Sequence, residues 1–494
     1  MKNNVTPEAL GISSEYLLNM LRRIDRKGIP MHSLLIARGD DVLLDAYWAP
    51  FTKDTLHRMN SVTKSFVGLA VGKLIEEGKL SLSDKVIDFF PEAKDYAVPE
   101  LRRGETVEDL LTMRTSYVLR PGKHWVKFKL YDRIKTYFEN PTDKLPGTTF
   151  YYDSLGSYIL TVIVERLTGK PFLEYLKEKV LLKIGFSEDA TCITDAMGYS
   201  WGDSGLLCTP HDLYRVGKFI NRGGVFSGEQ LMDRAYLERA VSKIVSNVSG
   251  GNDRQNSSYG YGYQIWHELL GGFGFHGMGM QYMICIPKLD LYLVCTADTQ
   301  GYDEARALFI GMYEELVREG VSDAPLPKNP SAYAELSEYV KNLKLVSLSG
   351  DATSPIADKI SGKKYILKEN KMGIKHFTVK LACGEGELIY ENAQGEKRLP
   401  FGINKNLFSK FPQDGYDNLK IGESPEGYRH PAATSASWQD GTTFDICCRI
   451  IGNHLGGLNI RIAFLGNKAT LEMTKTTNCF LNEYEGYAIG ELEK

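Results

Sequence analysis

The order of apolar and polar residues predicts strands at the start of the chain, followed by a long helical region. Residues 32–48, HSLLIARGDDVLLDAYW, form two apolar runs around the turn Arg38-Gly39-Asp40-Asp41, which predicts a β-hairpin. From Ser61 the pattern changes to SVTKSFVGLAVGKLIEEG, which is apolar on most faces and ends at Gly78. This is typical of a helix buried in the middle of a domain. Residues 80–255 are mostly helical by pattern, with loops at glycine and proline pairs.

Strands return after this helical region. Residues 259–268, 281–287 (QYMICIP) and 289–297 (LDLYLVCTA) predict strands, and the amphipathic stretch 302–320 predicts a helix. A sheet built from both ends of the segment, around a helical insertion, is the simplest assembly. We therefore expect an α+β domain over residues 1–325, with an antiparallel sheet that carries helices on both sides.

A proline-rich stretch, SDAPLPKNPSAY, begins at residue 322 and precedes a second domain. After a short helix over residues 334–345, apolar and polar residues alternate in four segments: KHFTVKLA, GELIYEN, TTFDICCRI and LNIRIAFLGNKATLEMT. We expect a mainly antiparallel β domain over residues 326–494, with a short helical linker at its start. Its expected role is to pack on the first domain or to shield its cleft, and a ligand-binding barrel is the alternative.

Composition restricts the possible partners. The 494 residues are 43% hydrophobic, enough for two or three domains, and the net charge is only -3. The charges are mixed along the chain without a basic stripe, so we expect neither a nucleic acid nor a membrane as partner. The N-terminal residues contain no apolar run typical of a secretory signal, which favours a cytoplasmic location.

The cysteines and histidines do not predict a metal site or a cofactor. The eight cysteines lie mostly inside apolar strand-like runs and form no C-x-x-C pair, which favours buried thiols over zinc ligands or disulfides. They are Cys192, Cys208, Cys285, Cys295, Cys383, Cys447, Cys448 and Cys479. The nine histidines show no H-E-x-x-H spacing. The run Gly272–Gly277 matches G-x-G-x-x-G, but a strand follows it, so we expect no dinucleotide site.

Candidate chemistry starts with Ser61 and Lys64, an S-x-x-K pair at the head of the buried helix. Residues three apart share one helix face, so a hydroxyl and an amine would lie side by side at the positive helix end. A second copy, Ser361 to Lys364, lies in a turn before a strand and lacks such a helix. The motif alone is therefore a weak signal.

Two further motifs follow along the chain. A turn, PGTTF, delivers Tyr152-Asp153-Ser154 just before another apolar helix, whereas the similar triplets at Tyr390 and Tyr416 lack that setting. His276, flanked by glycines, leads into an apolar strand.

With these motifs in this order, the chain resembles the serine β-lactamase-like family. This family includes class C β-lactamases, penicillin-binding proteins, esterases and nylon-oligomer hydrolases, and it orders S-x-x-K, then Y-x-N or Y-x-S, then K-T-G or H-x-G. The resemblance covers residues from about 10 to 320 and implies a β-lactamase/transpeptidase-like fold with a serine hydrolase activity that proceeds through an acyl-enzyme. It implies Ser61 as the nucleophile and Lys64 and Tyr152 as the proton-handling pair. It implies a substrate site lined by Ser154, His276, Gly277 and Met278.

Several alternatives stay open at this level. Burial could leave Lys64 neutral enough to act as the base, or a charged Lys64 could stabilise a tyrosinate at Tyr152. Besides the N–H of Ser61, the oxyanion needs a second donor, which we expect from Met278 to Met280. His276 is explained equally well by a structural role, and Ser154 by capping of the following helix.

The sequence predicts only a broad class of substrate. We expect a small ester, amide or short peptide as substrate. A peptidase for D-amino-acid peptides or a weak β-lactamase on the same site is one alternative, and a non-catalytic binding protein that keeps the fold is another. The oligomeric state is not determined by the sequence.

Overall fold

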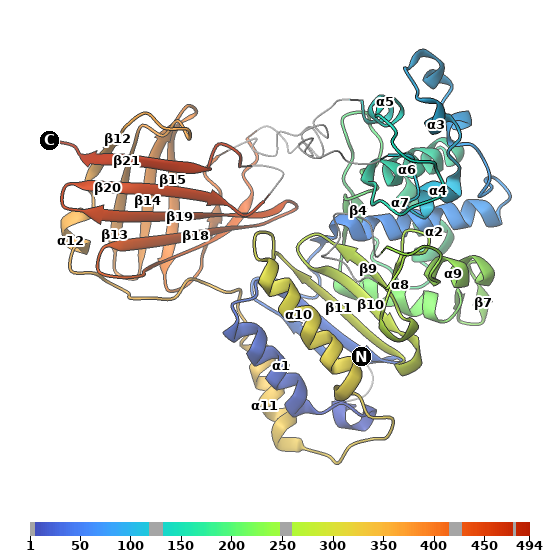
Figure 1. Ribbon diagram of the computed structural model, residues 1–494. Helices are drawn as coiled ribbons and strands as arrows, with labels where there is room; N and C mark the ends of the chain where they lie inside the picture. Colours follow the sequence, from blue (N-terminus) through green and yellow to red (C-terminus); the bar gives the residue numbers. More distant parts are fainter. Residues whose placement is uncertain (1–4, 118–131, 248–258, 414–426, 478–480) are drawn as a thin grey trace.

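The computed structural model describes residues 5–117, 132–247, 259–413, 427–477 and 481–494. Figure 1 shows an α+β part on one side and a barrel-like β part on the other. The predicted fold class is confirmed, because the first part holds an antiparallel sheet with helices on both faces and the second part is almost entirely antiparallel β.

The first sheet has six strands in the order β2-β1-β11-β10-β9-β8, and all neighbouring strands are antiparallel. The strands are β1 (Met31–Arg38), β2 (Asp41–Tyr47), β8 (Trp266–His267), β9 (Phe273–Gly277), β10 (Gln281–Ile286) and β11 (Leu291–Ala297). The predicted N-terminal hairpin is β1–β2. The strand predicted over 259–268 is limited to the two residues of β8.

Helices cover both faces of this sheet, because successive strand residues alternate between two apolar clusters. Leu34 and Ile36 pack toward α1 (Ser14–Arg26) and α10 (Asp303–Glu315), whereas Leu35 and Ala37 pack toward the opposite side. That side carries α2 (Thr63–Glu76) and α8 (Pro210–Asn221). Both layers can be followed in Figure 1.

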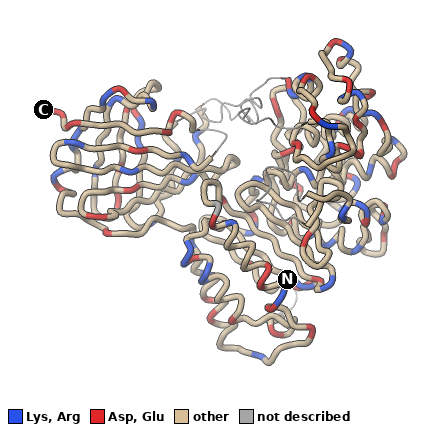
Figure 2. The backbone as a smooth tube through the Cα atoms, viewed as in Figure 1, with Lys and Arg blue, Asp and Glu red and all other residues tan. Residues whose placement is uncertain are grey.

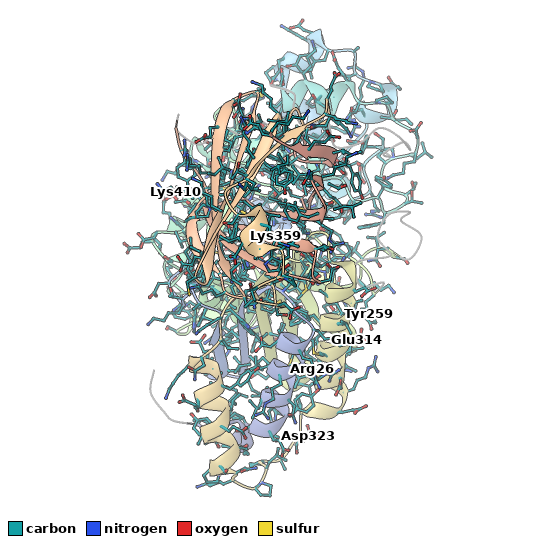
Figure 3. The ribbon with its side chains drawn as sticks, turned by 90° about the vertical axis from the view of Figure 1, so that its left-hand side faces the viewer. Arg26, Tyr259, Glu314, Asp323, Lys359 and Lys410 are labelled. Carbon is teal, nitrogen blue, oxygen red and sulfur yellow. The ribbon has the colours of Figure 1, made fainter. Side chains whose placement is uncertain are left out.

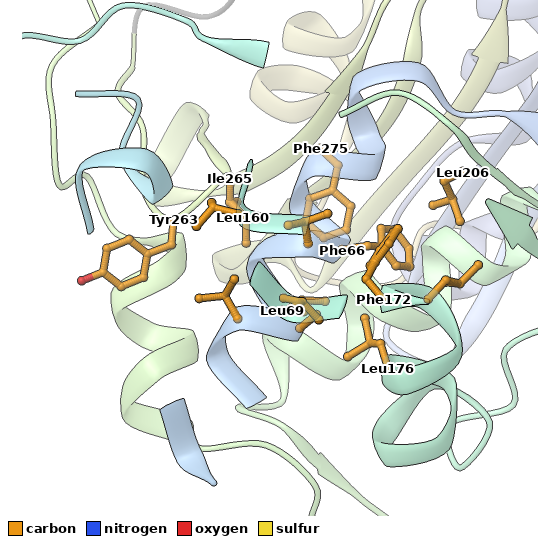
Figure 4. Packing of buried hydrophobic residues seen from close by; sticks show 14 of the residues in the cluster. Phe66, Leu69, Leu160, Phe172, Leu176, Leu206, Tyr263, Ile265 and Phe275 are labelled. Carbon is orange, nitrogen blue, oxygen red and sulfur yellow. The ribbon is translucent and has the colours of Figure 1, made fainter. Parts of the chain in front are cut away.

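The helical insertion surrounds α2, whose side chains are buried on nearly all faces. Phe66 and Leu69 of α2 pack with Leu160, Phe172 and Phe275 in this core (Figure 4). The other helices here are α3 (Glu100–Arg103), α4 (Val107–Leu111), α5 (Arg133–Glu139), α6 (Ser154–Thr168), α7 (Phe172–Leu176) and α9 (Arg234–Val241).

Short elements complete the first part. They are the helical turns η1 (Pro7–Leu10), η2 (Asn60–Val62), η3 (Val86–Phe89), η4 (Pro91–Asp95), η6 (Lys177–Leu181), η7 (Leu269–Gly271), η8 (Pro287–Leu289) and η9 (Leu316–Gly320). The short strands β3 (His57–Arg58), β5 (Leu206–Cys208) and β4 (Thr191–Cys192) form one small sheet, and β6 (Val225–Phe226) pairs with β7 (Glu229–Gln230).

The C-terminal part is a ten-stranded sheet that closes on itself. Its order is β15-β14-β13-β12-β21-β20-β19-β18-β17-β16, and an additional pairing of β15 with β17 completes the ring. The bounds are β12 (Lys364–Leu367), β13 (His376–Ala382), β14 (Glu385–Asn392), β15 (Gly395–Ile403), β16 (Leu407–Lys410), β17 (Pro431–Trp438), β18 (Thr443–Ile451), β19 (Leu455–Leu465), β20 (Lys468–Lys475) and β21 (Gly486–Leu492). A short helix, α12 (Ala357–Ile360), precedes the first strand. Large apolar side chains such as Phe377, Phe444 and Trp438 fill the interior.

The helix α11 (Pro330–Lys341) packs on α1 of the first part rather than on the barrel. Glu335 pairs with Arg22 of α1, and Leu336 is buried in the same cluster as the α1 side chains. The helix expected as a linker at the start of the second domain thus covers α1 with its apolar face. We propose that the first domain extends to about residue 345.

Surface charges and thiols agree only partly with the sequence-based expectations. Lys, Arg, Asp and Glu are interspersed over both parts (Figure 2). Five cysteines are buried, but Cys192 is partly exposed and Cys383 is exposed, so the expectation of buried thiols is wrong for Cys383. Cys383 follows β13 in a turn, where apolar context ends. Cys479 lies outside the described residues. Among the residues described, no helix is long and apolar enough to cross a membrane.

Candidate active site

Ser61 lies in the 3-10 turn η2 that leads into α2, and its side chain is half-buried. The residue before it, Asn60, has a φ of 48°, a left-handed conformation that asparagine tolerates better than most residues. Its carbonyl accepts a hydrogen bond from Thr63 Oγ1 at 2.6 Å. The bend therefore holds Ser61 at the head of the buried helix, as the sequence predicts.

The turn after β9 lies against the turn of Ser61. An added Cβ at Gly277 would lie 2.3 Å from the main-chain oxygen of Met59, so only glycine permits this approach. The Asn60 side chain donates from Nδ2 to the carbonyl of Met278 at 2.9 Å. The predicted positions Gly277 and Met278 are thus brought beside the Ser61 turn, and the Met278 side chain is 41% exposed.

Lys64 is buried and contacts Ser61 directly. Its Nζ lies 2.9 Å from Ser61 Oγ and donates to the main-chain oxygen of Asp203 at 2.6 Å. Burial lowers the pKa of Lys64 to about 8, the Asp203 carboxylate opposes this, and the charge of Arg133 adds to it. The amine is therefore far easier to deprotonate than an exposed lysine.

Tyr152 completes the predicted group of three. Its ring centroid lies 5.1 Å from Lys64 Nζ. The ring stacks on Trp266 with a centroid distance of 5.7 Å and an interplanar angle of 19°. Ser61, Lys64 and Tyr152, which come from η2, α2 and the segment before α6, therefore meet at one place.

Trp266, which stacks with Tyr152, also contacts His276. The Trp266 and His276 rings stack at 5.4 Å, and His276 Nε2 lies 2.6 Å from Glu268 Oε1. His276 pairs across strands with Tyr282, so both share the sheet face covered by α1 and α10. Its side chain is 6% exposed. A substrate contact by His276 stays a prediction, and its setting against the Trp266 ring and the Glu268 carboxylate favours a structural role.

Asp153, rather than Ser154, is the N-cap residue of α6. Its Oδ1 accepts from the N–H of Leu155 at 3.0 Å, and its Oδ2 accepts from Thr115 Oγ1 at 2.9 Å. Ser154 is the first residue of the helix and is buried. The capping alternative for Ser154 is therefore wrong, and its contact with a substrate stays a prediction.

Sequence reasoning missed Asn60, Arg133, Asp203 and Trp266. Asp203 lies in the loop Gly202 to Gly205, which the sequence shows only as a glycine-rich break. An added Cβ at Gly202 would lie 1.8 Å from Thr161 Oγ1, which explains a glycine beside Asp203. The glycines were thus the available signal for a tightly packed loop at this point.

The barrel reaches this region through the turn between β18 and β19. Arg58, three residues before Ser61, lies 2.7 Å through Nη1 from His454 Nδ1 of that turn. Its guanidinium also stacks on Trp201, at 4.2 Å from the ring centroid. A second link joins Gln300 Nε2 to the carbonyl of Leu455 at 3.1 Å.

The second S-x-x-K copy makes structural contacts within the barrel. Ser361 Oγ accepts from the N–H of Leu381 at 2.9 Å, and Lys364 pairs with Glu493 at 3.1 Å. The triplet at Tyr390 contributes to the barrel interior through Tyr484, at 3.0 Å between the hydroxyls. The triplet at Tyr416 lies outside the described residues. No set of three metal-ligating side chains occurs in the parts of the chain that the structure describes.

Comparison with known proteins places the chain in a family. The family model described as beta-lactamase matches residues 19–311. The chain is 28% identical over 275 residues to the 6-aminohexanoate-dimer hydrolase of Paenarthrobacter ureafaciens, covering 50% of this chain and 68% of that protein. It is 30% identical over 158 residues to esterase EstB of Burkholderia gladioli, covering 28% of this chain and 39% of the esterase.

A solved structure supports the fold. A protein from Bacillus anthracis named for 6-aminohexanoate-dimer hydrolase matches with a TM-score of 0.50 and 19% identity, over 63% of this chain and 86% of that one. The family match covers more than half of the chain and contains Ser61, Lys64, Tyr152 and the β9 turn. The chain belongs to the beta-lactamase family.

Proposed function

We propose that this protein is a serine hydrolase that acts through an acyl-enzyme on small esters, amides or short peptides. The observation that carries the proposal is the contact of 2.9 Å between Ser61 Oγ and the buried Lys64 Nζ. A serine hydroxyl needs an adjacent base to attack a carbonyl at neutral pH. A lysine whose pKa is lowered by burial to about 8 supplies one.

Acyl transfer would proceed in two halves. Ser61 Oγ attacks the substrate carbonyl while its proton passes to the neutral Lys64 amine, and the leaving group takes up a proton as the tetrahedral intermediate collapses. Water then attacks the acyl-enzyme, and Ser61 regains its proton. Tyr152, beside Lys64, is the alternative base, in which case Lys64 keeps its charge and stabilises the phenolate.

The oxyanion would form between Ser61 and the turn after β9. The N–H of Ser61 is one candidate donor, and the turn from Met278 to Met280 supplies the other. Two features support this assignment, the close approach of Gly277 to Met59 and the hydrogen bond from Asn60 to Met278, because they fix the turn relative to Ser61.

The names of the relatives suggest the substrate class. One is a hydrolase for a dimer of an amino acid and one is an esterase, so linear amides and simple esters are the first compounds to test. We expect poor activity on penicillins and cephalosporins. The position taken by a lysine in K-T-G holds His276 here, which stacks with Trp266 and pairs with Glu268 instead of offering a cation to a carboxylate.

Labelling with a fluorophosphonate tests the proposal. We expect a covalent adduct on Ser61, located by mass spectrometry, and no adduct in Ser61→Ala at unchanged thermal stability. Ser361→Ala is the matched control, since Ser361 lies in the second S-x-x-K copy, and it should label like the wild type. An adduct that persists in Ser61→Ala would contradict the assignment.

A panel of substrates then separates the alternatives. We expect turnover of p-nitrophenyl esters or amino-acid anilides, and little turnover of nitrocefin. Hydrolysis of D-amino-acid peptides in preference to all other compounds would favour the peptidase alternative. Absence of both labelling and turnover would favour a binding protein that keeps the fold. The cytoplasmic location stays a prediction.

A further inference from the structure

Asp203 connects Lys64 to a second buried cation. Its main-chain oxygen accepts from Lys64 Nζ at 2.6 Å, while its Oδ1 accepts from Arg133 Nη2 at 2.8 Å. The Arg133 and Asp203 side chains are only 3% and 5% exposed. One residue therefore touches the candidate base through its backbone and a buried guanidinium through its side chain.

The buried charge of Arg133 has few hydrogen-bond partners to replace its lost hydration. Its guanidinium carbon lies 4.0 Å from the ring centroid of Tyr158, and its Nε and Nη1 have no hydrogen-bond partner within the described ranges. A guanidinium that loses its hydration without full pairing costs stability. A functional role would explain why such an arrangement is present beside Lys64.

We propose that Arg133 and Asp203 act together as a positioning pair, which holds Lys64 against Ser61 and tunes its balance between ammonium and free amine. The inference rests on the proposed function of Lys64 and assigns two residues to it. Neither residue needs to touch the substrate, because each acts through Lys64.

The charges around Lys64 explain how the pair would work. Burial is the main influence and lowers the pKa of Lys64; the carboxylates of Asp203 and Asp153 raise it, and the guanidinium of Arg133 lowers it. The ring of Tyr152 lies on the remaining side. The two members of the pair therefore shift the pKa of Lys64 in opposite directions, so that each partly cancels the effect of the other.

Removal of the Arg133 charge and removal of the Asp203 charge should shift the titration midpoint of Lys64 in opposite directions. Arg133→Met removes the cation and leaves the Asp203 carboxylate unpaired, so the titration midpoint of Lys64 should rise by about one pH unit. Asp203→Asn keeps the backbone carbonyl but leaves Arg133 unopposed, so the midpoint should fall by a similar amount. Arg133→Lys keeps the charge and should lie close to the wild type.

The experiment measures the titration of Lys64 directly and the reactivity of Ser61 separately. Lys64 is titrated by carbon-13 NMR in protein labelled at lysine Cε, with the signal assigned by its loss in Lys64→Met. The pH dependence of Ser61 labelling by a fluorophosphonate is measured in the same variants. The matched control is the double variant Arg166→Met with Glu92→Gln, which removes an ion pair of 2.6 Å between α6 and η4 and should shift neither curve.

The outcomes separate the two hypotheses. No labelling of Ser61 in any variant would contradict the proposed function. Normal labelling, with a Lys64 midpoint that is unchanged or moves in the same direction in Arg133→Met and Asp203→Asn, would overturn the positioning pair. If Arg133→Met does not fold, Asp203→Asn and Arg133→Lys decide the question, since a downward shift in the first and none in the second is still required.

Discussion

At the scale of single residues, the burial of Lys64 in the candidate site lowers the free energy of unfolding. Lys64 has its usual pKa of 10.5 lowered to about 8, chiefly by burial. A lower pKa in the folded state means that the unfolded chain binds the proton more tightly. The cost is therefore fully present below about pH 8, decreases as the pH rises toward 10.5, and amounts to roughly 3 kcal/mol at its largest.

Lys64→Met should consequently stabilise the protein while abolishing activity. We expect a gain of about 1 to 3 kcal/mol at pH 7, less than the full cost because the hydrogen bond to Asp203 is lost as well. The gain should shrink as the pH rises from 8 to 10.5. Urea unfolding at several pH values measures it, and a variant that is less stable than the wild type at pH 7 would contradict the argument.

Lys64 and Tyr152 should act as one unit in catalysis. We expect Lys64→Ala and Tyr152→Phe each to lower kcat/KM by orders of magnitude, and the double variant to be little worse than either, because both residues serve the same proton transfer. A double-mutant cycle on an ester substrate checks this. Full additivity would show that the two residues do not share a proton path.

At the scale of elements, the S-x-x-K pair could be predicted because it is local. Ser61 and Lys64 are three residues apart at the head of a helix whose apolar pattern is plain. Asp203 and Arg133 could not be predicted, since they reach Lys64 only through the folding of loops and helices that are distant along the chain. No periodicity encodes such contacts.

The strand β9 shows a second limit. Its sequence, FGFHG, has no polar face, so the pattern predicts a strand without fixing which way His276 points. The pairing with β10 decides this by placing His276 opposite Tyr282. The position of α11 has a similar cause, because its apolar residues predict a helix but not the surface that it covers.

Gly277→Ala tests the contact between β9 and the Ser61 turn. The added methyl would lie 2.3 Å from the carbonyl of Met59, so the strand or the turn must move. We expect a loss of activity of at least about 10²-fold, as for other displacements at a reacting centre, with a Tm that falls only moderately. Gly311→Ala on α10, where nothing lies within 4 Å of the added carbon, is the control and should retain activity. Unchanged kcat/KM in Gly277→Ala would show that this turn does not hold the site.

At the scale of the whole molecule, the segment before α11 should be open to proteases, although the proposed boundary near residue 345 puts both of its sides in one domain. Residues 323–325 and 327–330 are exposed, and no helix or strand extends between η9 and α11. Figure 3 shows Asp323 at the far end of the first part from the barrel. We expect trypsin to cleave after Lys328.

The two fragments should stay together after this cleavage. α11 packs on α1, and Leu345 donates its N–H to Ala49 at 2.9 Å. Two bands on a denaturing gel and one peak in native size-exclusion chromatography are therefore expected. Separation of the fragments without denaturant would mean that the boundary lies near residue 325 after all.

The barrel and the first domain contact each other close to Ser61. Arg58, between Trp201 and His454, links the β18–β19 turn to the strand that precedes the candidate nucleophile. Arg449 of β18 lies over the ring of Tyr302, at 5.5 Å from the centroid, and provides a second contact between the two parts. The C-terminal part thus contacts the first part beside the site, and its role, whether packing on the first domain or shielding the cleft, stays a prediction.

The closure of the barrel has a consequence for the order of folding. β12 lies between β13, which follows it directly, and β21, so that Tyr365 pairs with both Phe377 and Leu492. During synthesis, the strands from β12 to β15 can form a sheet at once, but one edge of β12 stays unpaired until β21 has left the ribosome. Such non-local pairing is slow. The growing chain therefore passes through a stage in which the first domain can be complete while the edge of β12 is still unpaired. A chaperone that covers unpaired strand edges would be of most use at this stage.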